Sequence, residues 1–404
     1  MIKLNSHPAG RHFLQIPGPT NVPDAVLRAI DQPTIDHRGP EFAAFARQLL
    51  ADVRPIFQTR QPVIIYPGSG TLAWEAALAN ALSPGDRVLM VETGQFAALW
   101  KKMADKLGFA VEMIEGDWRS GVDAARVEER LRNDRAHAIK AVCVVHNETS
   151  TGVCSNIPAV RSALDAANHP ALLLVDAVSS LGAIDLRHDE WGVDVTIAGA
   201  QKGLMLPPGL GFNAVSAKAL AVARTSKFPR AFLRWEEIIE ANQSGSWPST
   251  PATNLLYGLA AAVEQLNAEG LSNVFARHAR HGAATRAAVR AWGLEILCRN
   301  PAEYSNSLTA VLMSDGMDAD ALRALILQRF NMSLGAGLGK VKGRVFRIGH
   351  VGDFNDLTLM GTLSGVEMGL QEFGVEPAAS GVLAAQDVLI QATAKRESDS
   401  RHAA

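Results

Sequence analysis

Short apolar runs alternate along the first half of the chain with longer stretches of mixed character. The strand-length runs cover residues 62–66, 87–91, 140–145, 171–175 and 194–198, and the helix-length stretches cover 71–82, 97–107, 123–133 and 157–167. Connections of this length are typical of βαβ units, so the pattern predicts a mostly parallel sheet with helices on both faces. The run 209–215 follows 194–198 without an intervening helix, which predicts one antiparallel pair inside this sheet.

In the second half of the chain, two long helix-length stretches come first, and single strands and helices then alternate. This pattern predicts a smaller α+β domain. Helices are expected at 257–268 and 273–291, then a strand at 307–313, a helix at 319–330, a strand at 345–348 and a final helix at 357–373. We therefore predict an N-terminal segment (1–20), a large domain (21–270), a small domain (271–390) and a polar tail (391–404).

Composition narrows the class of protein. The 404 residues are 48% hydrophobic, and 39 Lys and Arg against 41 Asp and Glu leave a formal net charge of −2. This balance excludes a disordered chain and a nucleic-acid binder driven by phosphate neutralisation. The three cysteines, Cys143, Cys154 and Cys298, form neither a disulfide framework nor a zinc-site spacing, and no metal is expected.

Targeting signals are not evident. The apolar runs are strand-sized, whereas a membrane-spanning helix needs about 20 residues. Residues 1–11 lack the apolar core of a signal peptide, and the last residues carry no retention or peroxisomal signal. We expect a cytoplasmic protein that acts on small molecules, with no membrane or nucleic-acid partner.

The segment Pro67-Gly68-Ser69-Gly70-Thr71 lies between a predicted strand and a predicted helix. A glycine-rich turn there exposes backbone N–H groups at the positive end of the helix dipole, where a phosphate binds well. The hydroxyl groups of Ser69 and Thr71 add donors. Because short glycine motifs also occur in ordinary strand-to-helix turns, this segment alone leaves both interpretations open.

Two charged residues follow later strands and are expected at the same edge of the sheet. Asp176 follows the run 171–175, and Lys202 follows the strand 194–198. In open α/β sheets ligands bind at this edge, where a carboxylate pairs with a protonated ring nitrogen and a desolvated lysine forms a Schiff base with a carbonyl. Taken singly, Asp176 is equally well explained as a helix cap, and Lys202 better as a solvated surface residue.

The order of the polar motifs indicates one cofactor. The segment 146–152 follows another strand, and Arg347 lies between apolar residues as a candidate carboxylate clamp, although a self-satisfied turn and an exposed strand arginine explain them singly. A phosphate turn, then Asp176, then Lys202, then a late arginine is the set that pyridoxal phosphate chemistry uses. The turn anchors the phosphate, the aspartate keeps the ring nitrogen protonated, the lysine holds the aldehyde and the arginine binds the substrate carboxylate.

Several longer motifs carry a family resemblance. They lie at residues 17–21, 34–40, 146–152, 172–180, 189–194, 201–202, 206–210 and 342–350. With them the chain resembles the class V aminotransferases of fold type I over nearly its whole length, and most closely their serine–glyoxylate and alanine–glyoxylate branches. The resemblance implies a large domain with a mostly parallel seven-stranded sheet between helices, a smaller C-terminal α+β domain, and a homodimer or homotetramer whose subunits share active sites.

The resemblance also implies a role for particular residues. Lys202 binds the cofactor aldehyde, Asp176 pairs with the pyridine nitrogen, and Thr149 lies near the ring hydroxyl. The residues expected to hold the phosphate are Ser69, Gly70, Thr71 and Gln201, with Thr250 reaching the phosphate of the neighbouring subunit. The residues expected to bind substrate are Gly18, Arg347 and, from the partner subunit, His37 and Arg38.

Two positions depart from the family pattern. Some alanine-using relatives place a tryptophan over the cofactor ring where this chain has Thr93, so we expect Phe96 to stack on the ring instead, as in the serine-using branch. Ala200 stands where a serine is usual. The first departure favours L-serine over alanine as amino donor, whereas Ala200 removes a hydroxyl group near the cofactor without changing the reaction class.

The resemblance therefore implies transamination between L-serine and glyoxylate, which gives hydroxypyruvate and glycine. The alternatives within the family are alanine or aspartate as donor to glyoxylate, or pyridoxamine with pyruvate. A cysteine desulfurase-like C–S lyase would need a mobile nucleophilic cysteine, for which Cys298 is the candidate in the second lobe. A regulator that only binds the cofactor is a third alternative, but no basic DNA-binding segment supports it.

Overall fold

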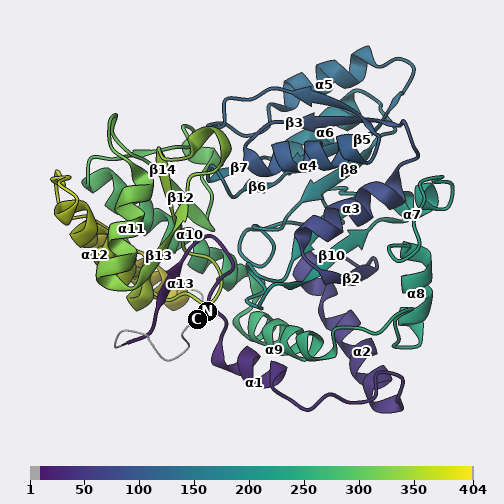
Figure 1. Ribbon diagram of the computed structural model, residues 1–404, viewed down its shortest axis with the longest axis horizontal. Helices are drawn as coiled ribbons and strands as arrows, with labels where there is room; N and C mark the ends of the chain where they lie inside the picture. The colour runs from purple at the N-terminus through teal and green to yellow at the C-terminus, as the bar shows by residue number, and fades with distance from the viewer. Residues whose placement is uncertain (1–9, 403–404) are drawn as a thin grey trace.

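The chain folds into two lobes that lie side by side (Figure 1). The computed structural model describes the backbone of residues 10–402 and the side chains of residues 10–392; the first nine residues of the predicted N-terminal segment and the last two of the predicted tail lie outside this range. The larger lobe contains a seven-stranded sheet and the smaller lobe a five-stranded sheet. None of the described helices is both long and apolar enough to cross a membrane.

The large sheet is mostly parallel, as predicted. Its strands follow the order β2-β10-β9-β8-β5-β3-β4, with bounds Val63–Gly68 (β2), Arg87–Val91 (β3), Ala110–Ile114 (β4), Ile139–Val145 (β5), Leu172–Asp176 (β8), Val195–Gly199 (β9) and Gly209–Val215 (β10). Strand β10 runs antiparallel to β9 and to β2, which confirms the antiparallel pair expected for residues 209–215. Parallel pairs join the remaining neighbours.

Helices cover both faces of this sheet because successive side chains of each strand point to opposite sides. In β5, for example, Cys143 packs into one core and Val142 into the other. One face is covered by α3 (Gly70–Ala81), α4 (Gln95–Lys106), α7 (Ala217–Ala223) and α8 (Trp235–Gln243). The other face is covered by α1 (Asp24–Ile30), α2 (Pro40–Asp52), α5 (Ala124–Asn133), α6 (Ile157–Ala166) and α9 (Thr253–Glu269).

The smaller lobe takes its edge strand from the N-terminal segment. Its sheet has the order β1-β13-β14-β12-β11, with bounds Phe13–Gln15 (β1), Glu295–Ile296 (β11), Leu308–Leu312 (β12), Met332–Ala336 (β13) and Val345–Gly349 (β14). Because β1 pairs with β13, the chain crosses from the small lobe into the large lobe directly after residue 15. This crossing takes residues 16–20 past the junction of the lobes.

The helices of the smaller lobe correct one prediction. They are α10 (Leu271–Ala291), α11 (Ala319–Phe330), α12 (Asp356–Glu372) and α13 (Gly381–His402). Residues 357–373 therefore do not form the final helix, because α13 follows and packs against α10 and α12. Among the described side chains of α13, Ala385 and Leu389 are buried one turn apart while Leu383 and Ile390 are exposed, so its apolar stripe is short and weak in the sequence.

Shorter elements complete the described chain. They are the strands β6 (Asn147–Glu148) and β7 (Val153–Cys154) and the 3-10 turns η1 (Arg54–Phe57), η2 (Pro301–Glu303) and η3 (Gly339–Val341). Strands β6 and β7 pair with each other beyond the end of β5.

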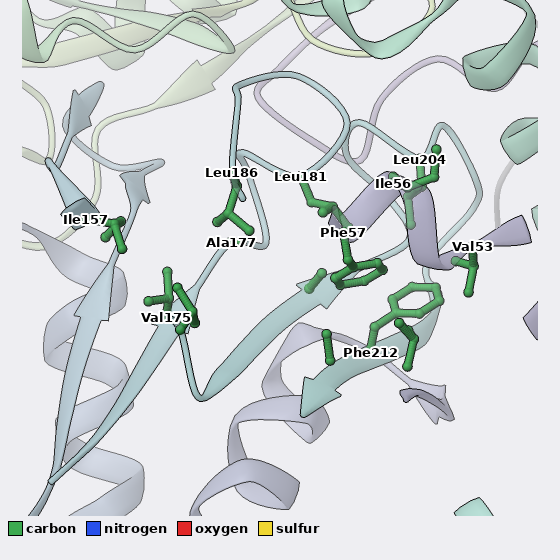
Figure 2. Close-up of a cluster of buried hydrophobic side chains, with 14 of the residues drawn as sticks. Val53, Ile56, Phe57, Ile157, Val175, Ala177, Leu181, Leu186, Leu204 and Phe212 are labelled. Carbon is green, nitrogen blue, oxygen red and sulfur yellow. The ribbon is translucent and has the colours of Figure 1, made fainter. Parts of the chain in front are cut away.

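The core beneath the sheet depends on large side chains brought from distant segments. Figure 2 shows Phe57 of η1 beside Phe212 of β10, and their ring centroids are 6.1 Å apart. Both rings are fully buried, whereas Phe232 is half exposed. Strand β10, which runs antiparallel to both of its neighbours, thus packs against the 3-10 turn that follows α2.

We predict that Phe212→Ala lowers the free energy of unfolding by about 3–5 kcal/mol, since it removes a buried ring and leaves a cavity. Phe232→Ala, the matched control on an exposed ring, should change it by less than about 0.5 kcal/mol. Urea unfolding followed by circular dichroism measures both values. Equal losses in the two variants would contradict the packing described for β10.

Candidate active site

A cavity of ≈ 230 Å³ lies at the carboxyl ends of β5, β8 and β9. It is lined by Gly18, Ser69, Gly70, Thr71, Trp74, Phe96, Asn147, Thr149, Asp176, Val178, Gln201 and Lys202. Nine predicted residues, from six separate segments of the chain between residues 18 and 202, therefore meet here. This is the edge of an open α/β sheet at which ligands bind.

Lys202 follows β9 and reaches into the cavity from a buried position. Its side chain is 8% exposed, and Nζ donates a hydrogen bond of 2.7 Å to the carbonyl oxygen of Pro17. Gly18 lies against this side chain: a Cβ atom there would stand 2.5 Å from Nζ, at a φ of +124° that favours glycine. Burial, and then the charge of Arg347, lower the pKa of Lys202 to about 8.

Asp176 is the last residue of β8, and both of its carboxylate oxygens accept hydrogen bonds. Oδ1 accepts from the backbone N–H of Val178 at 2.7 Å, and Oδ2 accepts from the indole N–H of Trp74 at 3.0 Å. Burial raises the pKa of this carboxyl to about 7, and the negative charge of Glu148 also raises it. The cavity therefore holds a nucleophilic amine and a basic carboxylate that water does not solvate.

Helix α3 begins at the cavity with uncapped amides. Its N-cap residue Ser69 makes no side-chain cap bond, whereas Asn156 and Ser216 cap α6 and α7 with their side chains. Buried Gln201 Oε1 has no hydrogen-bond partner among the residues that the structure describes. Exposed amides, nearby hydroxyl groups and a helix dipole make this end of the cavity suited to an anion.

Helix α4 presents Phe96 to the cavity, and a buried loop holds its first turn. The carboxylate of Glu148 accepts hydrogen bonds from the backbone N–H groups of Phe96 and Ala97, and Ser150 Oγ accepts one from Gln95 N–H. Glu148 also accepts from the hydroxyl group of Ser150 at 2.7 Å. The amides at this helix end are therefore occupied, in contrast to those of α3.

Arg347 comes from β14 of the smaller lobe and connects it to the cavity loop. Its Nη1 donates to the carbonyl oxygen of Thr149 at 2.7 Å, and its Nε donates to that of Ala336 at 2.7 Å. The guanidinium lies beside the cavity rather than in its lining and is 7% exposed. Its positive charge lowers the pKa of Lys202, so the two cations are close enough to repel each other.

Three predicted residues lie outside the cavity of this chain. Arg38 and Thr250 are exposed and His37 is half-buried, and none of them is among the described residues that line the cavity. The single chain therefore does not bring them to Lys202.

The cavity also contains residues that the sequence analysis did not single out. Trp74, Asn147 and Val178 line it. Trp74 lies three residues after Thr71 on α3, and helical spacing places both residues on one side of the helix. This spacing could have identified Trp74 from the sequence. Asn147 and Val178 belong to segments that were recognised, but no role was assigned to them.

The departing positions and Cys298 lie away from the lining. Thr93 and Ala200 are buried, and neither is among the described lining residues. Cys298 is buried, and its Sγ donates to the carbonyl oxygen of Asn300 at 3.5 Å. The described part of the chain therefore offers no cysteine at the cavity, which disfavours a desulfurase.

These residues fit pyridoxal phosphate. The uncapped end of α3 suits its phosphate, the Asp176 carboxylate suits its ring nitrogen, and the Lys202 amine suits its aldehyde, while Phe96 and Val178 offer apolar contact. Among residues 10–392, no group of three or more histidine, cysteine or acidic side chains is arranged to hold a metal ion.

The aminotransferase class-V family model matches residues 12–342. The serine–glyoxylate aminotransferase of Methylorubrum extorquens is 49% identical over 94% of this chain and 96% of its own length. The L-aspartate–glyoxylate aminotransferase of Paracoccus denitrificans is 45% identical, with the same coverage of each chain. The crystal structure of pyridoxamine–pyruvate aminotransferase from Mesorhizobium loti matches with a TM-score of 0.89 and 27% identity, covering 95% of this chain and 99% of that one.

The matched family, the fold and the cavity agree with one another. The chain belongs to the class-V aminotransferases, and it is a pyridoxal-phosphate-dependent enzyme.

Proposed function

We propose that the protein transfers the amino group of L-serine to glyoxylate, which gives hydroxypyruvate and glycine. The observation that carries the reaction class is the buried Lys202 amine in one cavity with the Asp176 carboxylate. The choice of donor is supported by the 49% identity to a serine–glyoxylate aminotransferase over nearly the whole chain.

Lys202 is proposed as the catalytic residue. The cofactor, when bound, supplies an aldehyde that exchanges amino groups and a ring that takes up the electron pair of the Cα–H bond. The Nζ atom of Lys202 would hold the aldehyde of the cofactor. Once the substrate amine has displaced it, the free Lys202 amine would take the proton from the substrate Cα and deliver it to the carbon that carried the aldehyde. A pKa near 8 leaves part of the amine neutral at physiological pH, which this role requires.

Asp176 and α3 are proposed to hold the cofactor at its two ends. The carboxylate of Asp176 keeps a proton on the ring nitrogen, because the negative carboxylate and the protonated nitrogen each stabilise the charged form of the other. Ser69, Gly70, Thr71 and Gln201 bind the phosphate at the N-terminus of α3. Phe96 and Thr149 border the ring between these ends.

Arg347 is proposed to bind the carboxylate that every substrate of the reaction carries. Its Nε and Nη1 atoms are held by the carbonyl oxygens of Ala336 and Thr149, so the guanidinium is oriented before substrate arrives. A charge-assisted hydrogen bond from a fixed arginine is stronger than one from a mobile side chain. Gly18 leaves room for substrate beside Lys202.

L-Aspartate is the second candidate donor, because a relative named for that donor is 45% identical over the same share of the chain. An aspartate would bring a second carboxylate into the cavity. Alanine, and pyridoxamine with pyruvate, remain alternatives within the family. The cofactor-binding regulator of the sequence analysis has no support in the site.

We also propose that two copies of the chain form a dimer in which each subunit contributes residues to the active site of the other. We propose that this dimer is located in the cytoplasm. His37, Arg38 and Thr250 lie outside the cavity of their own chain, which supports a role at the site of the partner subunit. Sedimentation equilibrium tests this assembly: a mass of 43.1 kDa, that of a single chain, would contradict it.

The donor is tested with the half-reaction. We expect L-serine to bleach the visible absorbance of the bound cofactor and glyoxylate to restore it, because the amino group moves first onto the cofactor and then off it. L-Alanine and L-aspartate serve as competing donors at equal concentration. Faster bleaching by L-aspartate would identify L-aspartate as the donor, and release of alanine or sulfide from cysteine would point to the C–S lyase.

The ionisation of Lys202 is tested by recombining the apo enzyme with the cofactor. We expect the recombination rate to rise with pH through a midpoint near 8, because only the neutral amine attacks the aldehyde. Stopped-flow absorbance measures the rate. Lys202→Ala should abolish the signal and turnover, and Lys218→Ala on the surface should change neither; a midpoint near the ordinary lysine pKa would contradict the described burial.

The role of Arg347 is tested by Arg347→Ala. We expect the half-saturating concentration of L-serine to rise at least about tenfold, because a charge-assisted contact to the carboxylate is lost. Arg344→Ala, three residues earlier and exposed, is the matched control and should be unchanged. An unchanged serine affinity in Arg347→Ala would remove the arginine from substrate binding.

A further inference from the structure

The indole of Trp74 contacts the carboxylate of Asp176 directly. Trp74 lies in the first turns of α3, is almost fully buried and lines the cavity. Its Nε1–H donates to Asp176 Oδ2 at 3.0 Å, and the other carboxylate oxygen is occupied by the N–H of Val178. With one donor on each oxygen, the carboxylate plane has a fixed orientation.

Neighbouring rings hold this indole in place. Trp74 stacks on Trp100 of α4, with ring centroids 5.8 Å apart and planes 13° apart. Phe96 meets it edge-on, with centroids 6.4 Å apart. Trp100 is equally buried, but its indole N–H has no hydrogen-bond partner among the described residues. Of the two stacked indoles, the one at the cavity uses its polar atom and the other contributes packing alone.

Two charged groups act on Asp176 besides this neutral donor. The carboxylate of Glu148, from β6, raises the pKa of Asp176, and the amine of Lys202, after β9, lowers it. Burial is the largest influence and raises the pKa to about 7. Two donors stabilise the charged form, the N–H of Val178 with the larger effect and the indole N–H of Trp74, so losing the indole donor lowers the ionised share of the carboxyl near neutral pH.

We propose that Trp74 is a positioning residue that keeps Asp176 ionised and aimed at the ring nitrogen of the cofactor. The inference rests on the proposed role of Asp176. It assigns the hydrogen bond, rather than the aromatic surface of Trp74, as the feature that the reaction needs. A phenylalanine at this position would keep an aromatic ring against Trp100 and lose the donor, together with part of the stacking surface, and Trp100→Phe makes the same loss of surface.

The direction of the effect follows from the hydrogen bond, which stabilises the ionised form of the Asp176 carboxyl. Loss of the indole N–H raises the pKa of Asp176, so a larger share of the carboxyl is neutral at a given pH. A neutral carboxyl does not pair with a protonated ring nitrogen. Cofactor binding, which weakens as the pH falls through the pKa of Asp176 in the apo enzyme, should therefore begin to weaken at a higher pH when the donor is missing.

The experiment compares Trp74→Phe with Trp100→Phe, which removes an indole N–H that has no hydrogen-bond partner among the described residues. The cofactor dissociation constant of each apo enzyme is measured across the neutral pH range by equilibrium titration. We expect Trp74→Phe to bind about tenfold more weakly near neutral pH and its acid-side midpoint to rise by about one pH unit. Trp100→Phe should follow the wild type in both quantities.

A second readout does not depend on the cofactor. The C=O stretch of a protonated carboxyl, followed by infrared difference spectroscopy on the apo enzyme, reports the titration of Asp176 once the band is assigned by its loss in Asp176→Asn. Its midpoint should move upward in Trp74→Phe. An unmoved midpoint, or an equal shift in Trp100→Phe, would overturn the inference.

Asp176→Asn separates this inference from the proposed function. If Asp176→Asn binds the cofactor and turns over like the wild type, the proposed role of Asp176 fails, and the inference with it. If Asp176→Asn is impaired and Trp74→Phe is not, only the inference fails. Should Trp74→Phe not fold, the wild-type protein with ¹⁵N-labelled indoles supplies the test: one indole N–H resonance must move with the titration of Asp176, and a pH-independent set would overturn the proposal.

Discussion

The central constraint in this molecule is the burial of an amine and a carboxylate in one small cavity. Asp176 ends β8 and Lys202 follows the neighbouring parallel strand β9, so the topology of the sheet brings them together. Burial disfavours the charge on each group and moves the two pKa values toward each other and toward neutrality. The surrounding structure supplies fixed partners in place of water: a carbonyl oxygen for the amine, and an amide and an indole for the carboxylate.

The two lobes are also connected to each other at this site. The N-terminal segment leaves the small sheet at β1 and passes Lys202, where Pro17 accepts its hydrogen bond and Gly18 gives it space. From the other side, Arg347 of the small lobe binds the loop that carries Thr149. Glu148 in that loop caps α4 and so sets the position of Phe96. A shift of either lobe would therefore change the position of the amine, the arginine and the aromatic ring together.

Most of the large sheet and most of the cavity lining could be predicted from the sequence, because both depend on residues that are close together along the chain. Buried strands such as β5 and β8 are continuous apolar runs, and Asp176 and Lys202 directly follow strands. The edge strand β4 was missed because only Ile114 in it is buried, so it lacks such a run. Trp74 was missed for a different reason: inside an apolar helix a tryptophan looks like core, and only the fold shows that its N–H meets Asp176. The places of His37, Arg38 and Thr250 depend on a second chain and stay predictions.

The most direct test of this account is to fix the bound cofactor to the protein by borohydride reduction and to map the modified peptide by mass spectrometry. The account predicts that the pyridoxyl phosphate group is found on Lys202, and that prior incubation with L-serine alone prevents the labelling. Labelling of another lysine, or labelling that L-serine leaves unchanged, would contradict the assignment of this cavity as the transaminating site.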